Sequence, residues 1–449
     1  MEGVNQAVTY LLGFKPYVLL PVILFIFAIT FRMKIGQAIK SSLTIGIGFI
    51  GIFIIFGFFV AQIGPAVESL VKKSGLGFNT LDVGWPQLAA ITWSYKLAPL
   101  LIILILAVNI IMLFFKLTRI VNIDIWNFWH FIFTGALVTE STGNVVLGIV
   151  AALVAAVIIL KLADWAAVAV QQFSGLSGIA VSTLSALTYY PFGVVGDRLL
   201  SKIPGLNNLN ANPEMIKKKL GIFGEPMIIG FLIGLLLGVG AGYEIKLILE
   251  LAFSLAAVIY ILPSMSRTLG QGLMPLSEQM KEFMKTKFPQ FGETFIGLDC
   301  AVIVGQTSVI VTGLLLMPLA LALAFVLPGV KFIPLGDLAN MIGAMVMVVV
   351  ATRGNVIRGF IIGIPILVGK LYIASFMAGI YTALARKTHF QSDGYQGLIT
   401  SFLDGGNFLR FWIVQIFKGA WEAWLIVPVL AGILYWTYKL SKKPVNGDC

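Results

Sequence analysis

Long apolar runs separated by short polar stretches limit this chain to a helical membrane protein. Hydrophobic residues make up 59% of its 449 residues and charged residues only 11%, whereas a soluble domain carries roughly 25% charged residues. A β-barrel would instead show short segments of alternating hydropathy. We therefore expect an all-α polytopic membrane protein with about eleven transmembrane helices, of about 20 apolar residues each. The expected spans are 17–31, 41–62, 96–115, 126–141, 145–161, 226–243, 246–263, 300–327, 336–351, 356–384 and 418–438.

A set of residues recurs, in the same order, about 210 positions further along the chain. An internal duplication of membrane helices is typical of secondary transporters, whose substrate site lies near the bilayer midplane between the repeats. The duplication therefore makes transport the leading functional hypothesis. The matching residues are Pro16 with Pro226, Pro65 and Glu68 with Pro275 and Glu278, Asp124 and Asn127 with Asp337 and Asn340, and Gly143-Asn144-Val145 with Gly354-Asn355-Val356.

The basic residues predict how the chain is oriented in the membrane. The net charge of +11 comes from short clusters between apolar runs, a distribution that orients membrane proteins and requires no nucleic acid. Placing these clusters inside gives an extracellular amino terminus and a cytoplasmic carboxyl terminus. Five spans separate the two copies, so the second copy is expected to insert upside down.

This orientation predicts four regions along the chain. They are a first membrane repeat at 10–165, a cytoplasmic connector with an optional re-entrant hairpin at 166–222, an inverted second repeat at 223–385, and a final transmembrane helix with a cytoplasmic tail at 386–449. The spans 126–141 and 336–351 are short enough to be broken or re-entrant. Residues 276–288 are expected to form an amphipathic helix at the cytoplasmic face.

Polar groups at membrane depth are the candidate site residues, since each ionisable group there costs roughly 2.5–3.5 kcal/mol on insertion scales. Asp82 and Trp85 lie at a helix break before Pro86, where an indole can pack on the C–H face of a polyol. An interfacial tryptophan anchor is the alternative. His130 is either a substrate ligand or a buried histidine bonded to a neighbour. Glu140 either lines a pocket or faces extracellular water.

Two further carboxylates and a hydroxyl-rich stretch complete the candidate set. Glu225 precedes Pro226 and either stabilises a helix amino terminus or accepts a proton from substrate. Asp299 and Gln306 are seven residues apart, so they share a face if the stretch is helical; a helix cap and a helix–helix hydrogen bond are the alternatives. Residues 177–190, with Ser182 and Thr183, are rich in hydroxyl groups and too short to span the membrane.

The sequence contains neither a phosphate-binding G-x-x-x-x-G-K-[ST] loop nor a zinc-binding pattern. We therefore expect no metal and no cofactor. A phosphoryl group, if one is transferred, must come from another protein.

Four segments together resemble the galactitol permeases, the membrane enzyme IIC components of the bacterial phosphoenolpyruvate:sugar phosphotransferase system, and more distantly the ascorbate permeases. The resemblance implies a homodimer of eleven-span protomers in the bacterial cell membrane, each with a core and an interface domain. It also implies that galactitol or a related polyol is phosphorylated as it crosses, by a phosphocysteine on a cytoplasmic IIB protein charged by IIA. The segments are Asp82–Pro86, Val121–Asn127, Phe223–Pro226 and Gly297–Asp299.

The resemblance implies a histidine at two positions where this chain has other residues. Ser182-Thr183 and Gln306 stand there instead, so either the role of these histidines lies elsewhere or the substrate differs.

The predicted mechanism is alternating access, with Asp299 or Glu225 accepting the proton of the attacking hydroxyl. The chain then takes part in phosphoryl transfer without carrying the donor. An ion-coupled secondary transporter of a polyol or ascorbate-like solute is the main alternative. A membrane enzyme acting on lipid and a channel fit the sequence less well.

Overall fold

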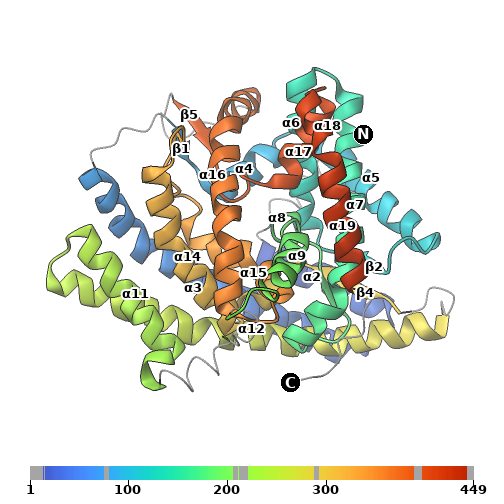
Figure 1. The fold of residues 1–449 in the computed structure, drawn as a ribbon. Helices are drawn as coiled ribbons and strands as arrows, with labels where there is room; N and C mark the ends of the chain where they lie inside the picture. The colour runs from blue at the N-terminus through green and yellow to red at the C-terminus, as the bar shows by residue number, and fades with distance from the viewer. Residues whose placement is uncertain are drawn as a thin grey trace.

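The computed structural model describes residues 14, 16–74, 80–205, 211, 221–287, 293–388 and 397–441, and it is mainly helical (Figure 1). Every expected span coincides with helical structure. The helices concerned are α2 (Pro16–Thr30), α3 (Ile35–Ser74), α5 (Ala98–Phe114), α6 (Trp129–Thr142), α7 (Val145–Ser174), α11 (Pro226–Ala241), α12 (Ile245–Lys287), α14 (Thr307–Val326), α15 (Met341–Ala351), α16 (Val356–Lys387) and, in the last span, α18 (Trp421–Leu425) and α19 (Val427–Ser441).

The predicted count of eleven transmembrane helices is not confirmed. Within the described ranges, six helical segments are long and apolar enough to cross a membrane. A seventh span results if α4 (Gly84–Trp93) and α5 count as one, although they meet at 96°. Several of the other helices, such as α2 and α15, fall short of the ~20 residues that a straight span needs. The chain is thus a multi-pass helical protein with at least one broken helix pair.

Five short strands, which an all-α prediction does not include, lie between the broken helices in the described part of the chain. β1 (Thr80–Asp82) pairs in parallel with β5 (Leu398–Thr400), and β4 (Phe295–Leu298) pairs in parallel with both β2 (Ile120–Asn122) and β3 (Ile179–Val181). Where helices break inside a membrane protein, the freed backbone N–H and C=O groups must bond within the protein. The strands supply those bonds.

The order of elements repeats along the chain. α2, α3 and β1 correspond to α11, α12 and β4; the 3-10 helix η1 (Ile125–Phe128), α6, α7 and β3 correspond to η4 (Leu338–Asn340), α15, α16 and β5. The strands pair across this repeat, because β1 joins β5 and β4 joins β3. The two halves therefore complete each other's sheets.

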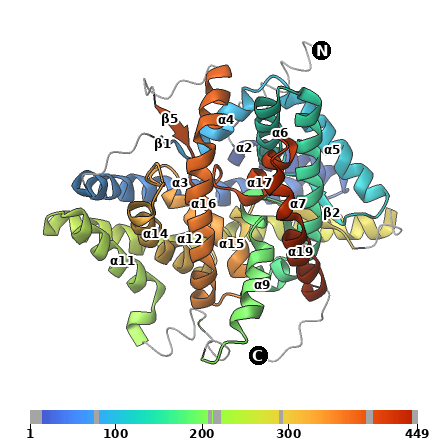
Figure 2. The same cartoon turned by 45° about the horizontal axis from the view of Figure 1, so that its top comes forward.

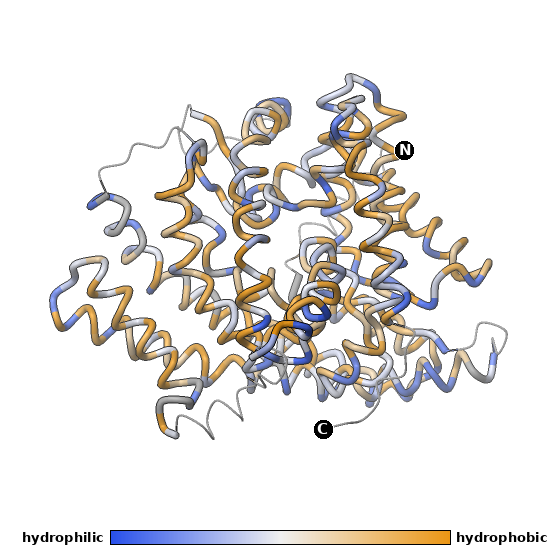
Figure 3. The backbone as a smooth tube through the Cα atoms, in the orientation of Figure 1, coloured by the Kyte–Doolittle hydropathy of each residue, from blue (hydrophilic) through white to orange (hydrophobic). Residues whose placement is uncertain are grey.

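Helices α3 and α12 are far longer than a membrane span. They contain 40 and 43 residues, or roughly 60 Å at 1.5 Å per residue, about twice the thickness of the hydrocarbon core. They pack against each other, and α12 runs crosswise to α16 in both views (Figures 1 and 2). The expected span 246–263 and the expected amphipathic helix 276–288 are thus one helix, and Phe288 lies outside the described residues. Hydrophilic and hydrophobic residues alternate along the carboxyl-terminal part of α12 (Figure 3).

The hydroxyl-rich stretch 177–190 lies inside the protein. It forms β3, α8 (Leu184–Leu187) and the start of α9 (Tyr190–Leu200), and most of its side chains are buried. Its neighbours include α7 and α15. The region expected to be a polar connector thus begins with a buried segment, while 206–210 and 212–220 lie outside the described residues.

Candidate functional site

A cavity of about 560 Å³ lies between elements of the two halves. Three indoles give it aromatic walls, and two carboxylates with an amide form a polar group on its surface. Residues from α3, α4, η1, α6, α13 (Ala301–Val304), α15 and α16 contribute to the wall. Its main side chains are Trp85, Trp126, Trp129, Asp124, Asn127, Asp299, His130, Thr183, Cys300, Lys370 and Asp404.

Trp85 is held in the wall by a crossing of two backbone segments. Gly84 begins α4 with φ +76°, a conformation that favours glycine. A Cβ atom on Gly336 would lie 2.4 Å from the carbonyl oxygen of Asp82, so the crossing needs glycine there too. The Asp337 carboxylate accepts a hydrogen bond of 2.7 Å from the Trp85 N–H. Asp82 accepts from three backbone N–H groups beneath this crossing and is not among the residues that line the cavity.

Asp299 lies in the wall, where the chain breaks between β4 and α13. One Asp299 carboxylate oxygen accepts a hydrogen bond of 2.6 Å from the Ala301 N–H. The side-chain amide of Asn127 donates to the other oxygen and also, at 2.7 Å, to the Asp124 carboxylate. Thr183 lines the same region and accepts a hydrogen bond of 2.9 Å from the Cys300 N–H. The carboxylates of Asp124 and Asp299 are thus joined by a single amide group.

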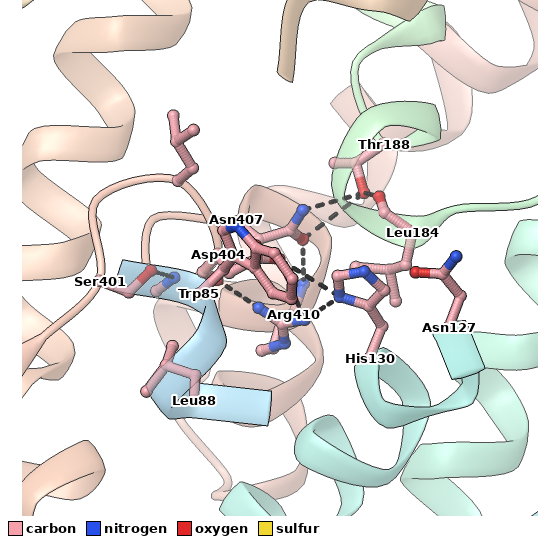
Figure 4. A network of polar contacts seen from close by, with 12 residues as sticks. Trp85, Leu88, Asn127, His130, Leu184, Thr188, Ser401, Asp404, Asn407 and Arg410 are labelled. Carbon is pink, nitrogen blue, oxygen red and sulfur yellow. Dashed lines mark hydrogen bonds and ion pairs between the residues drawn. The ribbon is translucent and has the colours of Figure 1, made fainter. Parts of the chain in front are cut away.

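A buried charge cluster surrounds His130 (Figure 4). The Nδ1 atom of His130 lies 3.2 Å from an Asp404 oxygen and 3.2 Å from the Arg410 Nη2 atom. The His130 ring stacks on Trp129 with centroids 4.0 Å apart. Lys370, from α16, donates to the carbonyl oxygen of Leu403 at 2.8 Å. Two basic side chains, one carboxylate and one histidine are therefore packed together, and all of them except Arg410 also line the cavity.

The structure brings four of the nine predicted site residues to the cavity wall: Trp85, His130, Thr183 and Asp299. The other five are not in the lining, although Asp82 lies in the same loop as Trp85 and supports it. Ser182 donates to the Asn122 side chain at 3.0 Å, and Glu140 pairs with Lys387 at 2.7 Å near the end of α6. Glu225 occupies the N-cap position of α11.

Gln306 occupies the N-cap position of α14, with extended backbone. Asp299 precedes α13, and the helix breaks between α13 and α14. The seven-residue spacing therefore does not place Asp299 and Gln306 on one helical face, because no continuous helix joins them.

Sequence reasoning did not identify five residues of the site as functional. Asp124 and Asn127 appeared as markers of the repeat and within the family-like segment Val121–Asn127, although a D-x-x-N pattern beside an aromatic run signals a polar break in a span. The sequence did not show whether Lys370, within the expected span 356–384, lines a pore or faces the cytoplasm. Asp404 and Arg410 both follow β5. Asp404 begins the string Asp404-Gly405-Gly406-Asn407, whose glycines and charge signal a buried polar loop.

Comparison with known proteins identifies the family. A family model described as the PTS system sugar-specific permease component matches residues 10–394. The galactitol-specific EIIC component of the PTS system from Escherichia coli (strain K12) is 36% identical over 415 residues, covering 92% of this chain and 91% of that protein. A putative permease IIC component of the same strain is 33% identical over 399 residues, covering 89% and 91%. The chain therefore belongs to the family of sugar-specific permease components of the phosphotransferase system, multi-pass proteins of the bacterial membrane.

Proposed function

We propose that this chain carries galactitol or a closely related polyol across the membrane while the polyol is phosphorylated. The observation that carries this proposal is a cavity with aromatic walls and a polar carboxylate–amide group, in a member of a sugar permease family with a galactitol-specific relative at 36% identity. A volume of about 560 Å³ lies within the ~300–1,000 Å³ usual for small-molecule sites.

The lining suits a polyhydroxylated substrate. The apolar faces of Trp85, Trp126 and Trp129 can pack against C–H groups. Asp124, Asn127 and Asp299 can exchange hydrogen bonds with hydroxyl groups, because carboxylates accept and an amide does both. Thr183 supports Asp299 by fixing the neighbouring Cys300 backbone. A site that bonds to hydroxyl groups rejects analogues that lack them.

Phosphoryl transfer requires a donor from outside the chain. We propose a phosphocysteine on a cytoplasmic IIB protein, recharged by IIA. The substrate hydroxyl attacks phosphorus, the O–P bond forms, the S–P bond breaks, and the thiolate stays on IIB. Asp299 accepts the hydroxyl proton, since it is a carboxylate in the wall; assistance of this kind is typically worth 10²–10⁴-fold in rate. Glu225 lies outside the cavity lining and is the less favoured base.

Substrate passage is proposed to occur by alternating access in a homodimer. We propose that the two repeats insert in opposite orientations, with the amino terminus outside and the carboxyl terminus in the cytoplasm. The repeated order of elements and the exchange of strands between halves support inverted repeats, which commonly surround a midplane site. The regions 10–165 and 223–385 would be the repeats, followed by a last membrane segment within 386–449.

The decisive experiment is uptake of labelled galactitol by vesicles that contain this chain. One set is loaded with phosphoenolpyruvate and the soluble phosphotransferase proteins, and a matched set carries only an ion gradient. Galactitol phosphate accumulating in the first set alone is the expected result. Unmodified galactitol driven by the gradient would instead identify an ion-coupled transporter, and no galactitol uptake in either set would refute the proposed substrate.

A further inference from the structure

Two pairs of aspartates occupy matching positions in the two halves of the chain. Asp82 and Asp299 each follow a leucine at the end of a strand, and Asp124 and Asp337 each precede a 3-10 helix. Asp82 lies beside Asp337, whose backbone N–H donates to it at 3.3 Å. Asp299 is joined to Asp124 through Asn127. The repeat therefore builds the same pair twice, and each pair takes one aspartate from each half.

The pair of Asp82 and Asp337 is closed off from the cavity and supplied with donors. Its two carboxylates are buried, and neither lines the cavity. Each accepts three hydrogen bonds, which stabilise its ionised form. This pair therefore holds the crossing of two loops and has a structural role. The donors are Gly84, Asp337 and Phe402 for Asp82, and Trp85, Leu403 and the Ser401 hydroxyl for Asp337.

The pair of Asp124 and Asp299 differs in position, because both of its members line the cavity. Asp124 accepts hydrogen bonds from Asn127, through the backbone N–H at 3.4 Å and the side-chain amide at 2.7 Å, and from the Asp299 backbone. The same amide nitrogen supplies Asp299, so both of its hydrogens are used. Because both carboxylates face the cavity, a proton or a substrate hydroxyl can reach them there.

The shared amide also brings the two carboxylates close together. Two hydrogen bonds from one nitrogen place their acceptor oxygens within about 6 Å of each other. Two carboxylates at such a distance, away from bulk water, resist ionising together and titrate as a pair.

We propose that Asp124 is a second acid–base residue of the site and that Asp124 and Asp299 hold one proton between them. This proposal rests on the proposed function and adds a residue to it. With the proton on Asp124, Asp299 is ionised and takes the proton of the attacking hydroxyl as the O–P bond forms and the S–P bond breaks. The incoming phosphoryl group, which carries up to two negative charges, then meets one carboxylate charge in place of two.

The pair responds to the other titratable groups of the wall. His130 on α6, Cys300 before α13, Lys370 on α16 and Asp404 after β5 line the same cavity. Their charges affect the pH at which the pair loses its second proton, so the test compares variants with the wild-type chain and does not rely on an absolute pH.

The first measurement is the infrared carbonyl stretch of protonated carboxyl groups in the purified chain as pH is raised. We expect a component of this absorption near neutral pH, seen as the difference between wild type and variant, that is missing from both Asp124→Asn and Asp299→Asn. The control Asp197→Asn removes an aspartate paired with Arg358 at 2.9 Å outside the cavity, and it should retain the absorption. Asp124→Glu, which restores a carboxyl group, should retain it too. An absorption that persists unchanged in Asp124→Asn would overturn the proposal.

The second measurement is the pH profile of galactitol phosphorylation in vesicles. In Asp124→Asn the decline on the alkaline side should move by at least one pH unit, because the pair can no longer gain a second charge. Asp299→Asn should lose at least about 100-fold in rate. An Asp124→Asn profile that matches the wild type would contradict the shared proton.

The infrared measurement requires neither sugar nor partner proteins. An infrared signature of the pair without phosphorylation by the wild type would refute the proposed function and leave the shared proton standing. Phosphorylation by the wild type without that infrared signature would refute the shared proton and leave the proposed function standing. Gel filtration of each variant separates these outcomes from misfolding.

Discussion

Replacing Asp404 with alanine leaves two buried cations without the carboxylate that compensates them. Arg410 and Lys370 are fully buried, and the Asp404 oxygen lies 3.8 Å from Arg410 Nη2 and 3.2 Å from His130 Nδ1. At an effective dielectric constant of 20, one charge pair at 3.8 Å is worth about 4 kcal/mol. Removing one partner of a buried pair typically destabilises a protein by about 3–5 kcal/mol. We expect Asp404→Ala to lower the free energy of unfolding by about that amount.

The assay is unfolding of the purified chain in mixed micelles of increasing denaturing detergent, followed by tryptophan fluorescence. Asp197→Ala is the matched control, because its partner Arg358 lies at 2.9 Å but both side chains retain some exposure; the expected loss is about 1 kcal/mol or less. The double variant Asp404→Leu with Arg410→Met removes both charges and should recover part of the lost stability. If Asp404→Ala is no worse than Asp197→Ala, or the double variant is no better than the single, the cluster does not act through charge compensation.

Three further changes test other parts of the structure. Gly336→Ala should destabilise the chain by about 1–3 kcal/mol, because the added Cβ would meet backbone atoms at 2.4 and 2.6 Å; Gly343→Ala, with open space around it, should be neutral in the same unfolding assay. Asn109→Leu should cost about 2–3 kcal/mol in that assay, since it leaves the Ile120 carbonyl and the Asn122 N–H of β2 without the partner they have at 2.8 and 2.9 Å. Trp85→Ala should weaken galactitol binding at least tenfold, measured by equilibrium dialysis without phosphoenolpyruvate, whereas unchanged binding would remove Trp85 from the site.

The helices could be predicted from sequence because their signal is continuous. Each expected span is a mainly apolar run, and the helices lie where these runs lie. The breaks were also visible, since Pro86 and Gly84 mark the start of α4. The continuity of α12 was not visible, because Pro263 and Pro275 suggest an interruption that the helix accommodates.

The site was predictable only in part, because some of its residues come together through contacts between distant parts of the sequence. Trp85, His130 and Asp299 stand out as polar or aromatic residues at membrane depth. Asp404, by contrast, contacts His130 although the two residues are 274 positions apart in the sequence. No local sequence pattern predicts that contact. Asp124 was not predicted as a site residue, since its position beside Asp299 depends on how the two halves fold against each other.

The exchange of strands between the halves has a consequence for how the chain is made. β2 and β3 are both complete before residue 182 is synthesised, yet their shared partner β4 begins at Phe295. The partner of β1 is β5, which is synthesised later still because it begins at Leu398. Over that interval their backbone N–H and C=O groups lack their final partners, which is unfavourable in lipid. The first half of the chain is therefore expected to depend on the insertion machinery until most of the second half has been translated, and a chain truncated after α9 should be degraded.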